Sequence, residues 1–111
     1  MSGSPRPGQP VRGSATGAPI MALLDLLSRR WMLRVIWELR DEPLTFRQLQ
    51  ERCDGMSPSV LNTRLRELRD ADIVDDSGAP GYRLTDEGRN LLEAWPPLEA
   101  WAQRWAERQN R

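Results

Sequence analysis

The hydrophobic and polar positions in the first half of the chain predict a series of short amphipathic helices. From Ile20 to Trp31, large apolar side chains recur every three or four positions, which is the spacing of one apolar helix face. Ser28 is expected to cap a second helix, which ends before Pro43 because proline pushes the preceding residue away from helical angles. A short extended piece and a brief helix to about Arg52 are expected to follow.

The clearest helix start in the chain lies at Ser57, where a capping hydroxyl precedes a proline at the first helical position. The predicted helix runs from Pro58 to about Asp70. Its apolar face carries leucines spaced four and three apart, Leu61, Leu65 and Leu68. At 100° per residue, the opposite face carries small polar side chains and an arginine, namely Ser59, Asn62, Thr63 and Arg66. Two helices joined by a tight turn, the second with such a face, form the helix-turn-helix pattern.

The second half of the chain predicts a β-hairpin followed by two helices. Alternating positions at residues 73–74 and 82–84 indicate two strands, with a turn rich in glycine and proline between them. Thr85 is expected to cap the next helix, which is interrupted at Pro96, and a final amphipathic helix follows. The predicted fold is mainly α with a small β-hairpin. This is a winged helix-turn-helix, in which the hairpin is the wing.

Composition divides the chain into a tail and one domain. Residues 1–19 contain four glycines, four prolines and three serines, which predicts a disordered tail. Residues 20–111 are expected to form the winged helix-turn-helix domain with a C-terminal dimerisation helix. No run of roughly eighteen apolar residues and no apolar leader is present, so a cytoplasmic protein without a membrane span or secretory signal is expected.

The residue inventory argues against an enzyme. The chain has no histidine, which removes the commonest general base and the commonest metal ligand. The single cysteine, Cys53, has no histidine partner and is expected to be a buried, inert thiol. Carboxylate pairs such as Asp75 and Asp76 are interpreted as solvated charges. No catalytic site, metal site or cofactor is therefore expected.

Charge is distributed unevenly, although the formal net charge is zero. Residues 29–69 contain nine arginines against six acidic residues, a local charge of +3. Residues 70–88 contain one arginine against six acidic residues, a local charge of −5. The basic stretch includes the predicted helix-turn-helix, and the acidic stretch includes the predicted wing.

Four segments in this order resemble the HxlR-type winged helix-turn-helix family of transcriptional regulators. They are RRWMLRVIWEL at 29–39, LTFRQL at 44–49, MSPSVLNTRLREL at 56–68 and LTDEGRNLL at 84–92. The resemblance extends over about residues 22–106. It implies that the helix after Ser57 is the recognition helix, and that the protein is a homodimer joined through its first and last helices.

The function expected is that of a transcriptional regulator that binds a pseudo-palindromic operator as a homodimer. Its partners would be double-stranded DNA and a second copy of itself. Base readout is expected from Ser59, Asn62, Thr63 and Arg66, since asparagine pairs with adenine and arginine with guanine. Phosphate contacts are expected from Arg47, Ser57, Arg64 and Arg83. The expected dimer interface combines positions of the first helix and of an apolar C-terminal stripe: Leu23, Leu27, Leu91, Trp95, Leu98, Trp101, Ala102 and Trp105.

The chain departs from the family in ways that leave alternatives open. Its wing is short and acidic, and carboxylates near DNA oppose binding. It also lacks the cysteine that electrophile-sensing members carry before the first helix. One alternative is a protein-interaction module whose acidic wing, with Asp72, Asp75 and Asp76, meets a basic partner. Another is a ligand-sensing dimer with weak DNA binding, in which tryptophan-lined pockets take a small, planar, apolar effector.

Overall fold

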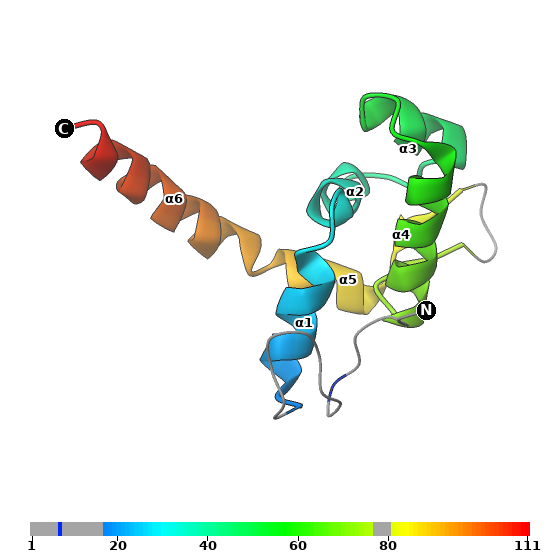
Figure 1. Cartoon of the computed structure of the whole chain (residues 1–111), viewed down its shortest axis with the longest axis horizontal. Coiled ribbons are helices and arrows are strands. Elements are labelled where there is room, and N and C mark those ends of the chain that lie inside the picture. The colour runs from blue at the N-terminus through cyan, green and yellow to red at the C-terminus, as the bar shows by residue number, and fades with distance from the viewer. Residues whose placement is uncertain (1–6, 8–16, 77–80) are drawn as a thin grey trace.

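The computed structural model describes residue 7 and residues 17–76 and 81–111. Its elements are α1 (Pro19–Leu27), α2 (Met32–Glu38), α3 (Phe46–Arg52), α4 (Pro58–Asp70), β1 (Val74–Asp75), β2 (Arg83–Leu84), α5 (Asp86–Leu92) and α6 (Trp95–Gln109) (Figure 1). This is the predicted class, mainly helical with one small hairpin. Most of the predicted tail at residues 1–19 and residues 77–80 of the hairpin turn lie outside the described residues.

The core is formed by one face each of α2, α3 and α4 together with the base of the hairpin. The leucine face predicted for α4 is confirmed, because Leu61, Leu65 and Leu68 are at most 1% exposed. They pack in one cluster with residues of the neighbouring elements, among them Val35 and Leu49. Burying a leucine side chain stabilises the fold by about 1.5–3 kcal/mol, so this face anchors α4 firmly.

The hairpin is tied to the helix-turn-helix through the segment that precedes α3. β1 and β2 pair antiparallel, with Val74 opposite Leu84. Leu44 forms a further bridge with Tyr82, in which each backbone N–H donates to the other residue's carbonyl, at 2.9 and 2.7 Å. Gly81 has a φ of +100°, and a Cβ there would lie 2.4 Å from the Leu44 carbonyl oxygen. Only glycine therefore allows the wing to approach this closely.

The corner between α1 and α2 differs from the prediction. Ser28 ends α1 instead of starting α2, so its expected role as an N-cap was wrong. Its hydroxyl donates a hydrogen bond backward to the Asp25 carbonyl, at 2.8 Å, and does not accept one from a following N–H. α2 begins only at Met32, after Trp31, which has a φ of +73°. The turn at residues 28–31 takes up the positions that periodicity alone assigned to a helix.

α6 stands apart from the other helices and extends away from them (Figure 1). It begins at Trp95, and two prolines occupy its first turn, where their missing N–H groups cost no hydrogen bonds. Its base is attached to the domain by stacking of Trp95 on Trp37 of α2, with ring centroids 5.0 Å apart. No residue of α6 is buried, so the helix makes few apolar contacts with the other residues that the structure describes.

Candidate nucleic-acid interface

α3 and α4 are set at their angle by local hydrogen bonds at the turn between them. Asp54 and Gly55 both have positive φ, and the Gln50 side-chain amide donates to the Met56 carbonyl at 3.0 Å. Ser57 then caps α4, its Oγ accepting from the Val60 N–H at 3.2 Å. The Ser57 Oγ also lies 3.0 Å from the Ser59 Oγ. These contacts build the helix-turn-helix and leave the polar face of α4 outward.

Among the four residues predicted to contact bases, two have freely available side chains. Asn62 and Arg66 are exposed. In the part of the chain that the structure describes, neither makes a side-chain hydrogen bond or an ion pair. They lie four residues apart and therefore on adjacent turns of one helix face. Thr63 is half-buried and its hydroxyl donates to the Ser59 carbonyl at 2.9 Å, so this hydroxyl is less available than the Asn62 and Arg66 side chains.

The residues predicted to contact phosphates differ in their surroundings. The Arg47 side chain is 89% exposed and only loosely paired, with its Nε 3.5 Å from an oxygen of Glu51. Arg83 on the wing lies 3.4 Å from Asp75. Arg64 lies inward. Its Nε donates to the Arg30 carbonyl at 2.8 Å and its Nη1 pairs with Glu67. Arg64 would have to leave both of these partners to reach a phosphate.

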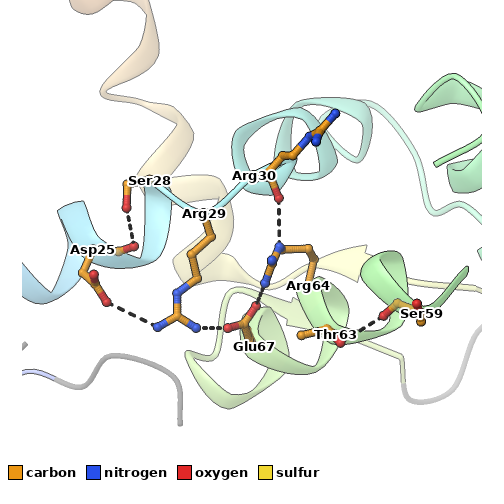
Figure 2. Close-up of polar contacts among 8 residues, drawn as sticks. All are labelled: Asp25, Ser28, Arg29, Arg30, Ser59, Thr63, Arg64 and Glu67. Carbon is orange, nitrogen blue, oxygen red and sulfur yellow. Dashed lines mark hydrogen bonds and ion pairs between the residues drawn. The ribbon is translucent and has the colours of Figure 1, made fainter. Parts of the chain in front are cut away.

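Glu67 is the buried charged residue of this region, and sequence reasoning missed its role. Figure 2 shows its carboxylate between two guanidinium groups, those of Arg64 and Arg29. Arg29 also reaches Asp25 of α1, at 3.3 Å. Burial lowers the pKa of Arg64, and the nearby Arg29 charge lowers it further. The sequence did carry a signal, because Glu67 lies directly between a residue of the polar helix face and Leu68 of the apolar face.

The acidic wing is partly compensated by the protein's own arginines. Asp76 accepts from Arg69 at 2.8 Å, and Asp75 lies beside Arg83. Arg83 is already counted in the −5 of residues 70–88, but Arg69 lies outside that stretch, so its pair with Asp76 offsets one of the five negative charges. This weakens both the repulsion expected toward DNA and the attraction expected toward a basic protein partner.

The predicted dimer residues divide into an exposed group and a packed group. Leu98, Trp101 and Trp105 are 60%, 53% and 52% exposed, and the two tryptophan rings stack with centroids 5.8 Å apart. Ala102 is also exposed, and Trp95 and Leu23 are half-buried. Leu27 and Leu91 instead pack against the domain's own core. On α1 the most exposed large apolar residues are Ile20 and Leu24, which sequence reasoning did not select.

Three further features of the described residues concern the cysteine, membrane spans and metal ligands. Cys53 is fully buried as predicted, and burial raises the pKa of its thiol. None of the described helices is long and apolar enough to cross a membrane. Within the same residues, no group of three or more histidine, cysteine, aspartate or glutamate side chains is arranged to hold a metal ion.

Comparison with known sequences shows one family. The family described as "HxlR-like helix-turn-helix" matches residues 26–110. The regulator YodB of Bacillus subtilis is 32% identical over 89 residues, which is 75% of this chain and 80% of YodB. YvaP of the same organism, named an uncharacterised HTH-type transcriptional regulator, is 28% identical over 88 residues, which is 74% of this chain and 82% of YvaP.

Solved structures agree with these sequence matches. Quinone-bound YodB of B. subtilis has a TM-score of 0.72 and 30% identity, and the match covers 77% of this chain and 96% of YodB. A structure from Enterococcus faecalis, described as a transcriptional regulator of the MarR family, has a TM-score of 0.74 and 28% identity, over 83% of this chain and 89% of its own. The fold is thus that of winged helix-turn-helix regulators.

Proposed function

This chain belongs to the HxlR-like helix-turn-helix family of transcriptional regulators, and from that premise we propose that it reads operator DNA as a homodimer through α4. The partner is double-stranded DNA with two inverted half-sites. The proposal includes cytoplasmic localisation and no catalytic activity, in line with relatives named as transcriptional regulators.

The observation that supports this proposal most strongly is the availability of two polar side chains on the exposed face of α4. Asn62 and Arg66 extend from a helix whose opposite face is anchored in the core, so they are presented on a rigid support. Amide and guanidinium groups can each make two hydrogen bonds to a base edge in the major groove, to adenine and to guanine respectively. We therefore assign base readout mainly to these two side chains, assisted by Ser59 and Thr63. Phosphate positioning falls to Arg47, Ser57 and Arg83.

Dimerisation is proposed through the exposed apolar residues of α6 together with those of α1. Leu98, Trp101 and Trp105 present large apolar surfaces with no cover inside the described chain. Tryptophan is enriched at the energetic centres of interfaces, and an uncovered stripe of this size would promote aggregation. On α1, Ile20 and Leu24 replace Leu27 in this proposal because they are the exposed residues.

Two substitutions test the assignment by affecting different parts of binding. Arg66→Ala should cost about 1–3 kcal/mol at one base pair of the operator and relax discrimination there. Arg83→Ala should weaken binding to every operator variant by about the same factor as to the native operator. It should also make the affinity less dependent on salt concentration. Fluorescence anisotropy on an operator and its single-base variants, at several salt concentrations, measures both effects. Equal losses across all base variants for Arg66→Ala would contradict base readout by that side chain.

A second role, sensing of a small aromatic effector, is favoured by an open depression at the base of α6. The depression holds about 460 Å³ and is lined mainly by apolar groups, including Trp37, Leu92, Trp95 and Pro96. YodB has been captured with a quinone, although this chain's single cysteine is buried and unsuited to covalent capture. Titration with a naphthoquinone should quench tryptophan fluorescence saturably in the native chain and weakly in Trp95→Leu. Unchanged quenching in that variant would place any binding elsewhere.

A further inference from the structure

The turn at residues 28–31, which joins α1 to α2, is strained and is held from one side. Trp31 has a φ of +73°, a region that bulky side chains rarely adopt and that persists only where the surroundings hold it. The two residues before it are bound to α4. Arg29 makes this contact through its side chain and Arg30 through its carbonyl oxygen. The recognition helix therefore braces the turn that determines the direction of α1.

Glu67 is the centre of this brace. Its side chain is 8% exposed, and each carboxylate oxygen pairs with a different guanidinium group, Oε2 with Arg29 and Oε1 with Arg64 (Figure 2). Arg64 in turn donates a hydrogen bond from its Nε to the Arg30 carbonyl oxygen, 2.8 Å away. Arg29 in turn forms an ion pair with Asp25, near the end of α1, at 3.3 Å. One buried carboxylate thus connects α4 to both sides of the turn.

Among the described residues, this group contains two acidic and two basic side chains. All four are largely shielded from water, with side-chain exposures of 17% for Arg29, 11% for Asp25 and 18% for Arg64, beside the 8% of Glu67. A buried ion-pair group contributes little net stability compared with apolar packing, but removal of one member leaves the others unpaired in a poorly hydrated site. Such a group is suited to specifying a geometry, because its hydrogen bonds require particular distances and angles.

We propose that Glu67 is a positioning residue that holds α1 at a fixed angle to the recognition helix and thereby sets the spacing between the two half-sites that the dimer reads. This inference rests on the proposed function, because α1 carries the exposed Ile20 and Leu24 assigned to the dimer interface. Rotation of α1 relative to α4 would change the separation of the two recognition helices. It would leave the Asn62 and Arg66 side chains and their base preferences unchanged.

The test compares Glu67→Gln with Glu42→Gln. Glutamine keeps the shape of Glu67 and one acceptor oxygen, but it turns an NH₂ group toward the second guanidinium. Glu42→Gln makes the same chemical change at an exposed pair, where Glu42 lies 3.1 Å from Arg52 and its side chain is 57% exposed. Each variant is measured on probes with constant half-sites and a spacer shortened or lengthened by one to three base pairs. Arg29→Gln serves as a second variant of the brace, in case Glu67→Gln folds poorly.

The native chain and Glu42→Gln should lose about tenfold or more in affinity when the spacer is wrong, since DNA or protein must then be deformed. Glu67→Gln should lose most of this discrimination, to roughly twofold, while half-site base preference is retained. Unchanged spacer discrimination in a folded Glu67→Gln variant would overturn the inference. So would a parallel loss of base preference, which would indicate general damage to α4.

A measurement without DNA separates this inference from the proposed function. Amide hydrogen exchange should become faster in Glu67→Gln at Arg29 and Met32, whose N–H groups donate to the Leu26 and Arg29 carbonyls within the turn. Exchange at the capped start of α4, at Val60, should be unchanged. If exchange in the turn is not altered, the bracing role of Glu67 is wrong whether or not the protein binds DNA. If exchange changes but no duplex is bound, it is the proposed function that fails.

Discussion

α4 and α6 are amphipathic helices of similar length, 13 and 15 residues, yet they relate to the rest of the chain in opposite ways. The apolar face of α4 is almost completely buried in the domain's own core. The apolar face of α6 is more than half exposed at Leu98, Trp101 and Trp105. Both helices carry an apolar face, but α4 buries its face within the chain, whereas the proposed dimer would cover the face of α6 with a second molecule.

The largest expected effect is on folding, and it should separate the two helices clearly. Leu65→Ala removes a side chain that is 1% exposed and should lower the free energy of unfolding by about 2–5 kcal/mol. Leu98→Ala should change it by no more than about 0.5 kcal/mol, provided that the protein is dilute enough to be monomeric. Urea denaturation at low protein concentration measures both. Comparable losses would mean that α6 packs within its own domain.

The next effect is on association. Replacing Trp101 and Trp105 together with alanine should remove about 2 kcal/mol or more from dimerisation and shift the protein toward monomer. Leu33→Ala is the matched control, because Leu33 is a large exposed apolar residue on α2, outside the proposed interface. Sedimentation velocity over a range of concentrations gives the dissociation constants. A native chain that stays monomeric at high concentration would refute the interpretation of α6.

The smallest expected effect concerns Cys53, which is buried in the same core as the apolar face of α4. Burial raises the pKa of its thiol above the ordinary value of 9.0. The stabilisation of the folded state by the protonated thiol is therefore fully present below pH 9. It is lost as the pH rises through the pKa of the thiol in the folded state. Because a single proton is involved, the free energy of unfolding falls by at most about 1.4 kcal/mol per pH unit. Urea denaturation above pH 9 should show this fall in the native chain and a smaller one in Cys53→Ala. Parallel pH profiles would contradict a buried thiol.

Local sequence was sufficient for α4 but not for the first turn of the domain. Ser57 and the following proline define a helix start through their own backbone preferences, and the leucine spacing then determines the buried face. Ser28 could either accept from a following N–H or donate to a preceding carbonyl, and the tertiary turn decided between these. On α1, apolar residues occur around much of the helix, so periodicity could not tell whether Leu27 or Leu24 would face the core.

Glu67 shows a further limit of sequence reasoning. Its spacing of three residues from Arg64 is visible along the helix, but its second partner, Arg29, lies 38 positions away. Whether a glutamate beside an apolar face is solvated or buried in an ion-pair group depends on which charges the fold brings to it. The helix α4 and its buried face were therefore predictable, and the contacts that connect it to α1 were not.

Selection of bound duplexes from a random pool at defined salt tests whether two α4 helices read DNA together. Such a dimer should enrich inverted half-sites with centres about 34 Å, one helical turn, apart, and its affinity should decrease as salt is raised. Failure to enrich any sequence, with no salt-sensitive binding by a protein shown to be dimeric, would contradict this proposal.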